Sequence, residues 1–102
     1  MKKYKVVLHP DAAADIESAF QWGCRTWGEE NARVWIRELR KVIRNRLTSM
    51  PLSCPRAPES EELDVTVRQL IVGRYRLLFI VEKRTVEILH VKGSYVGGPL
   101  SE

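Results

Sequence analysis

Three apolar, β-prone runs within residues 65–91 constrain the fold more than any other part of the sequence. Gly73-Arg74 and Lys83-Arg84 separate these runs, and a glycine at the first central position suits a two-residue type II′ hairpin turn. Two short polar breaks between three such runs predict a three-stranded antiparallel meander. The other elements are expected to pack against this small sheet.

Strand side chains alternate between the two faces of a sheet, so two-residue turns assign each residue to a face. One face is the expected core face, with Leu70, Val72, Tyr75, Leu77, Phe79, Val81, Val86, Ile88 and His90. The opposite face is mixed and carries Val67, Gln69, Ile71, Arg76, Leu78, Ile80, Glu82, Glu87, Leu89 and Val91. We expect the mixed face to be partly exposed, or to be covered by something that this chain does not supply.

The first half of the chain predicts a strand and two helices. Residues 5–8 form a short β-prone run that ends at His9-Pro10, and Asp11 stands where a helix N-cap is expected. Apolar residues then recur at helical spacing up to Gly28, and again from Ala32 to Leu47, before Pro51 stops the second helix. The short link at Gly28 makes these helices an antiparallel hairpin.

The remaining segments read as connections. Residues 51–64 hold three prolines and four carboxylates without periodicity, which predicts a surface connection. Glycine and proline predict a flexible tail from about residue 93. The expected fold is α+β, in one domain over residues 1–102: an N-terminal strand, a helical hairpin on one sheet face, then the meander.

Composition narrows the functional classes. The net charge is +4 and the pI is near 9.3, which favours an anionic partner or marks an ordinary basic surface. No segment approaches the roughly 20 apolar residues of a membrane span, and the first residues do not form a signal peptide, so we expect a cytoplasmic protein. Cys24 and Cys54 lack metal or redox spacing and are expected to be reduced and buried or inert.

No self-sufficient catalytic motif, metal site or cofactor motif is present in the sequence. Arg76 is the main candidate, because a guanidinium on a half-open sheet face can bind a phosphate or a carboxylate. The alternative is a local ion pair with Glu87 or Glu82. Arg68 is expected on the other face, near the connection 51–64.

Two surfaces suit a partner. Leu78, Ile80, Leu89 and Val91 are expected to form an exposed apolar patch of a size that marks an interaction site. The second helix carries a basic face, which includes Arg37 and Arg44 and is either solvated or in contact with an anionic partner.

The chain resembles the RelE/ParE superfamily of type II toxin-antitoxin toxins over nearly its whole length. The matching pieces are YKVVLHPDAAADIE, the WGEENA link, the helix ending at SMP, VRQLIVGRYRLLFIVE and VEILHV. The resemblance implies the superfamily's fold and a toxin that a co-expressed antitoxin neutralises as a hetero-oligomer, without a membrane. We expect the antitoxin, through an apolar stripe with acidic flanks, to contact Leu78, Ile80, Leu89, Val91, Arg37 and Arg44.

The resemblance does not by itself identify the molecule that the toxin acts on. RelE-like members cut mRNA on the ribosome with a set of basic residues and a tyrosine, whereas ParE-like members lack that set and poison DNA gyrase. Here the strand arginine of the nuclease pattern falls on Arg76, with Lys92 and Tyr95 as the nearest further groups, and most of the set is missing. We therefore favour the ParE-like branch.

Two alternatives stay open. Arg76, Lys92 and Tyr95 would be the catalytic residues of a ribosome-dependent endoribonuclease. A toxin-fold protein that only binds its antitoxin is the other possibility, because KGSYVGG stands where many ParE-like chains carry arginines after the last strand.

Overall fold

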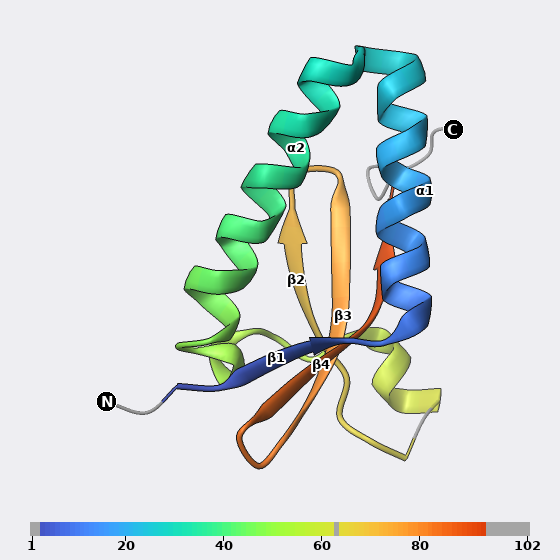
Figure 1. Cartoon of the computed structure of the whole chain (residues 1–102). Helices are drawn as coiled ribbons and strands as arrows, with labels where there is room; N and C mark the ends of the chain where they lie inside the picture. Colours follow the sequence, from blue (N-terminus) through green and yellow to red (C-terminus); the bar gives the residue numbers. More distant parts are fainter. Residues whose placement is uncertain (1–2, 63, 94–102) are drawn as a thin grey trace.

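The computed structural model describes residues 3–62 and 64–93. A four-stranded sheet with the order β1-β4-β3-β2 carries two helices on one face (Figure 1). In chain order the elements are β1 (Lys5–Leu8), α1 (Pro10–Trp27), α2 (Glu29–Val42), a π-helical turn (Ile43–Leu47), 3-10 turns at Pro51–Ser53 and Pro58–Glu62, β2 (Arg68–Val72), β3 (Tyr75–Glu82) and β4 (Thr85–Lys92). The α+β prediction is confirmed. No helix in the described ranges is long and apolar enough to cross a membrane.

Helix α1 begins two residues earlier than the sequence indicated. His9, not Asp11, is the N-cap: its Nδ1 accepts a hydrogen bond from the Asp11 backbone N at 3.0 Å, and Pro10 fills the first helical position. Proline suits that position because its missing N–H would have no helical partner anyway.

The helical hairpin turns at Gly28, as predicted. Gly28 has φ 95° and ψ 153°, and its N–H donates to the Cys24 carbonyl to close α1. This backbone region is open essentially to glycine alone. Helix α2 passes directly into the π-helical turn at residues 43–47, so the second helix ends before Met50.

Both turns of the meander hold two residues. Val72 pairs with Tyr75 across the first turn, and Glu82 pairs with Thr85 across the second. Gly73 has φ 61°, which its lack of a side chain permits at the first position of a type II′ turn. Strand β1 pairs in parallel with β4, from Lys5↔Thr85 to Leu8↔Ile88.

A β-bulge in β4 alters the predicted faces. Phe79 pairs with Ile88 but Leu78 pairs with His90, so Leu89 is an extra residue in β4. Beyond the bulge the alternation is inverted. His90 is therefore exposed, although the sequence placed it on the core face, and Val91 is buried in the main core, although the sequence placed it on the mixed face.

The main core lies between the helices and the sheet. It comprises Ala12, Leu39, Leu47, Cys54, Leu70, Tyr75, Leu77, Phe79, Val86, Ile88 and Val91. Cys24 and Cys54 are both free thiols, half-buried and buried respectively. Burial of this apolar surface is the dominant favourable term for such a domain.

The connection between the helices and β2 lies on the surface, as the sequence suggested, but part of it is buried. It packs on the sheet face opposite the helices, where Ala57, Val67 and Leu78 form a second buried cluster with Ile80 against it. Backbone bonds from Ala57 N to Val67 O (2.7 Å) and from Gln69 N to Pro55 O (3.0 Å) attach it to β2 and the residues before it. The buried Ser60 hydroxyl both donates to Val67 O and accepts from Val67 N, each at 2.7 Å. The chain itself therefore covers much of the mixed face.

We predict that Gly28→Ala destabilises the protein by about 1–3 kcal/mol, because an alanine at this φ and ψ is strained. Urea unfolding followed by circular dichroism measures the change. Glu30→Ala, two residues further on at an exposed position, is the matched control and should cost less than about 0.5 kcal/mol. Equal losses in the two variants would contradict the assignment of backbone strain to Gly28.

Candidate functional site

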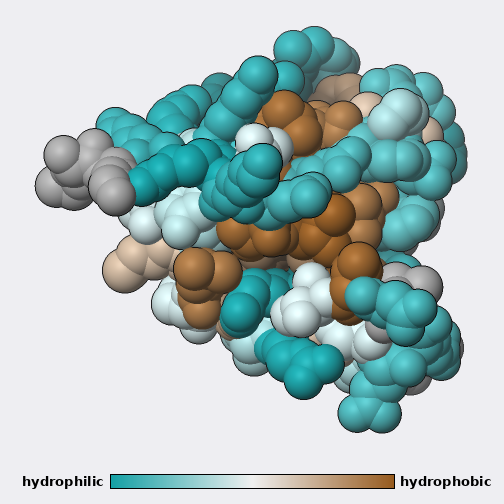
Figure 2. Space-filling model, turned by 90° about the horizontal axis from the view of Figure 1, so that it is seen from below, coloured by the Kyte–Doolittle hydropathy of each residue, from teal (hydrophilic) through white to brown (hydrophobic). Residues whose placement is uncertain are grey.

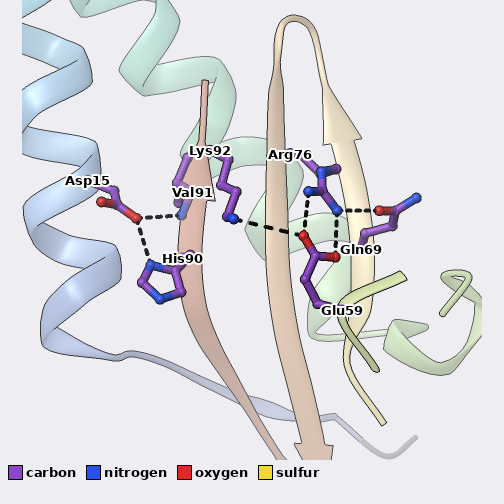
Figure 3. Close-up of polar contacts among 7 residues, drawn as sticks. All are labelled: Asp15, Glu59, Gln69, Arg76, His90, Val91 and Lys92. Atoms are coloured by element: carbon purple, nitrogen blue, oxygen red, sulfur yellow. Dashed lines mark hydrogen bonds and ion pairs between the residues drawn. The ribbon is translucent and has the colours of Figure 1, made fainter. Parts of the chain in front are cut away.

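Arg76, the main candidate from the sequence, is engaged by the connection. Its Nη1 donates to Glu59 Oε1 at 3.0 Å and its Nη2 donates to Glu59 Oε2 at 2.7 Å (Figure 3). Nη1 also donates to Gln69 Oε1 at 2.8 Å. The Arg76 side chain is only 14% exposed. Arg76 thus holds the acidic 3-10 turn on the sheet, in the fork geometry that makes such pairs specific.

The carboxylate of Glu59 is correspondingly stabilised in its ionised form. Hydrogen bonding from Arg76 lowers the pKa of Glu59 from its ordinary 4.5 to about 2, against the opposing effect of burial. Lys92, which pairs with Arg76 across the strands, adds a weaker attraction with its Nζ 3.9 Å from Glu59 Oε2. Two cations from neighbouring strands therefore converge on one carboxylate.

The structure corrects two expectations for this face. The partner of Arg76 in the structure is Glu59 from the connection, whereas the sequence proposed Glu87 or Glu82. The apolar patch is also reduced, since Leu78 is buried under the connection and Val91 is buried in the main core, which leaves Ile80 and Leu89 half-buried.

The other sequence candidates are dispersed. Arg68 lies on the opposite face from Arg76, as predicted, and its Nη1 donates to the Cys54 carbonyl of the connection at 2.7 Å. Tyr95 and the expected flexible tail lie outside the described residues, apart from Gly93. Among the described residues, no group of three or more histidine, cysteine, aspartate or glutamate side chains could hold a metal ion.

Asp15 makes contacts that the sequence did not indicate. Its Oδ2 accepts from the Val91 backbone N at 3.0 Å and lies 3.2 Å from Nδ1 of His90 (Figure 3). The contact lies where β4 has passed the end of β1. A helix side chain therefore satisfies a strand edge that has no strand beside it.

A concave surface lies on the side of the helical hairpin. One hollow of about 420 Å³ between the helices is lined by Ile16, Glu17, Phe20, Arg33, Ile36, Arg37 and Arg40. A second hollow of about 450 Å³ lies between the helices and β1 and is lined by Val6, Leu8, Ile16, Ile36, Leu39, Arg40, Ile43, Arg44, Thr48 and Ile88. The hollows share three residues, so we treat them as one feature, the helix groove.

Basic and apolar side chains occupy different parts of the helix groove. Arg33, Arg37, Arg40 and Arg44 follow at steps of three and four residues along α2 and its π-helical extension, so they lie on one side of the helix. The floor is mainly aliphatic. Figure 2 shows hydrophobic residues exposed between hydrophilic ones on the underside of the molecule. The surface suits a partner with apolar and acidic side chains.

The sequence analysis predicted two of the four arginines that line the helix groove. Arg37 and Arg44, predicted to bind a partner, both line the groove. Arg33, Arg40 and the aliphatic floor were not singled out. The arginine spacing could be read from the sequence, but the hollow beside it depends on how the helices splay over β1.

One comparison with known proteins identifies the family of this chain. Residues 6–94 match a family profile described as the ParE toxin of the type II toxin-antitoxin system parDE. Among solved structures, the chain is similar to one titled "Chromosomal ParDE TA system from P. aeruginosa", with a TM-score of 0.71 and 17% identity over 88% of this chain and 95% of that chain. At this identity the similarity concerns the fold. No curated protein matched the sequence.

We predict that Glu59→Gln destabilises the fold by about 1–3 kcal/mol at pH 7, because it removes the charge that Arg76 needs as a partner in a partly buried site. Thermal unfolding measures the loss. Glu29→Gln, which breaks the exposed Glu29–Arg33 pair on α2, is the matched control and should cost about 0.5 kcal/mol or less.

The same pair predicts a pH dependence with a defined sign. The folded-state pKa of Glu59 lies below its unfolded value, so the ionised pair contributes stability above pH 4.5 that is lost as the pH falls toward 2. The stability difference between the native protein and Glu59→Gln should therefore shrink over that interval. A difference that stays constant from pH 7 down to 2 would argue against an ionic role for Glu59.

Proposed function

The chain belongs to the ParE toxin family of type II toxin-antitoxin systems, and from this premise we propose that it inhibits DNA gyrase and is neutralised by a cognate antitoxin. Both activities place it in the cytoplasm, as a hetero-oligomer with the antitoxin until the antitoxin is lost. The observation that supports a gyrase target most directly is the engagement of Arg76 by Glu59. The helix groove supports the antitoxin contact.

A ribosome-dependent nuclease would need free charged groups on the sheet. Cleavage of RNA by its own 2′-hydroxyl requires proton transfer and stabilisation of an extra charge on phosphorus. On this sheet, both terminal nitrogens of Arg76 donate to Glu59, and Lys92 lies near the same carboxylate. The guanidinium that would have to bind a phosphate is thus engaged by the acidic turn, which favours the gyrase target over mRNA cleavage.

Antitoxin binding is proposed for the helix groove. An antitoxin segment with apolar side chains can fill the aliphatic floor, while acidic side chains beside them meet Arg33, Arg37, Arg40 and Arg44. Charge complementarity of this kind increases the association rate and selects the partner. Ile80 and Leu89 remain candidates for a secondary contact, because the side chain of each is only half-buried and its other part is accessible to a partner.

Purified toxin, free of antitoxin, should convert supercoiled plasmid into gyrase-linked linear DNA in the presence of gyrase and ATP. The measurement is the linear band on a gel after removal of bound gyrase by protease. The control is the same amount of toxin already bound to its antitoxin, which should give no linear band. Folded toxin that leaves both supercoiling and plasmid integrity unchanged would refute gyrase as the target.

Arg40→Glu should weaken antitoxin binding by about 10- to 100-fold, because Arg40 lines both hollows of the groove and the change reverses its charge. Titration calorimetry measures the dissociation constant. Lys41→Glu changes the charge by the same amount on the next residue, which does not line either hollow, and should have an effect below about threefold. Equal effects would point to long-range charge rather than to the groove.

A further inference from the structure

The net charge of the chain is concentrated in one helical segment. Residues 31–48 contain a single carboxylate, Glu38, against six cations: Arg33, Arg37, Arg40, Lys41, Arg44 and Arg46. The whole chain has a net charge of +4, so the remainder of the sequence is close to neutral. Helix α2 and its π-helical turn therefore carry the basic character of this protein.

Three of these cations form a row on the outside of the molecule. Arg37, Arg40 and Arg44 are exposed and follow at steps of three and four residues, so they lie on one side of the helix. Within residues 3–62 and 64–93, none of these three side chains makes a hydrogen bond or an ion pair. Helix α2 forms one margin of the molecule in Figure 1, where a large partner can approach it. We call these three residues the arginine row.

Two carboxylates near the arginine row have other partners. Glu29 forms an exposed ion pair with Arg33, which extends the row by one step toward the start of α2. Glu17 of α1 lines the same groove but accepts a hydrogen bond from Gln21 at 2.9 Å. Neither carboxylate therefore neutralises the arginine row.

The arginine row opposes the stability of its own helix. Like charges three or four residues apart repel one another and destabilise a helix. Three of the four positions at these spacings from Arg37 are cationic, namely Arg33, Arg40 and Lys41. An arrangement that weakens the helix and has no local anion is expected at a surface that binds an anionic partner.

The length of the arginine row suits a phosphate backbone. Arg37 and Arg44 lie about 10 Å apart along the helix axis, at 1.5 Å per residue. Duplex DNA carries one negative charge per about 1.7 Å of its axis, so a row of this length meets several phosphates. Each guanidinium can bind a phosphate through two parallel N–H donors. Three successive arginines can thus contact one stretch of backbone together.

Single-stranded nucleic acid fits this surface less well. Proteins that bind single strands stack the bases on aromatic side chains. Among the described residues that line the helix groove, Phe20 is the one aromatic side chain, and it is half-buried. The surface therefore offers phosphate contacts with little base stacking, which suits a duplex.

We propose that the arginine row binds the phosphate backbone of duplex DNA, so that the toxin contacts the DNA held by gyrase as well as the enzyme. This inference rests on the proposed gyrase inhibition and specifies one of its contacts. Because the arginine row lines the helix groove, DNA on the row and a protein segment in the groove exclude each other.

Binding of antitoxin-free toxin to a short fluorescein-labelled DNA duplex tests this contact without gyrase. Fluorescence anisotropy gives the dissociation constant between about 50 and 200 mM salt. Three phosphate contacts predict that the logarithm of the association constant falls with the logarithm of the salt concentration, with a slope of about −3. Absence of binding at the lowest salt, or an affinity that does not depend on salt, would overturn the inference.

A matched pair of double variants assigns the binding to the arginine row. Replacement of Arg37 and Arg44 by glutamine should weaken duplex binding at least about tenfold and reduce the salt slope by about 2. Replacement of Arg25 and Arg56 by glutamine removes the same charge at exposed positions that line neither hollow, and should change the affinity less than about threefold. Circular dichroism confirms that both variants are folded. Equal losses in the two variants would show that net charge, and not the row, binds the DNA.

The inference and the proposed function fail in different ways. Gyrase-linked linear DNA made by a toxin that does not bind the duplex would overturn the DNA contact while leaving gyrase inhibition in place. Duplex binding through the arginine row without any linear DNA in the gyrase assay would overturn gyrase as the target, and with it the contact to DNA held by gyrase. Tighter binding to RNA of the same length and sequence than to the DNA duplex would overturn the choice of DNA.

Discussion

Burial of the central strand β3 on both faces is the constraint on which the rest of this structure depends. Leu77 and Phe79 are fully buried toward the helices, while Leu78 is 4% exposed toward the other side. A strand of this kind needs two covering layers. The helical hairpin supplies one, and the connection between the second helix and β2 supplies the other. Because the second layer is thin and acidic, the guanidinium of Arg76 on the same face can be neutralised by Glu59 from within that layer.

Local signals in the sequence predicted most of the elements. The turn at Gly73-Arg74, the glycine link between the helices and the strand at residues 5–8 each depend on neighbouring residues, and the structure confirms them. The β-bulge at Leu89 was not predictable in this way, because no glycine or proline marks it and alternation continues on both sides. One extra residue was enough to exchange His90 and Val91 between the faces.

The candidate site was predicted less completely because it depends on contacts between distant segments. The connection 51–64 has the composition of a loop, and its packing rests on small or compact groups such as Ala57 and the reciprocal bonds of Ser60 with Val67. Composition does not reveal such bonds. The partner of Arg76 lies 17 positions away for the same reason. The arginine spacing on α2 was visible, whereas the groove arises only when both helices lie over β1.

The outer edge of β1 and the apolar hollow of the helix groove lie next to each other. The connection covers much of the outer sheet face, and Asp15 accepts a hydrogen bond from the β4 edge beyond β1. The edge of β1 has neither protection, and it borders the apolar hollow of the helix groove. Native proteins usually guard an edge strand with charge, proline or a covering segment, since an open one invites pairing with other chains. Here the strand is only four residues long and its neighbours are arginines, which disfavour pairing with a second copy of this basic chain while remaining compatible with an acidic partner.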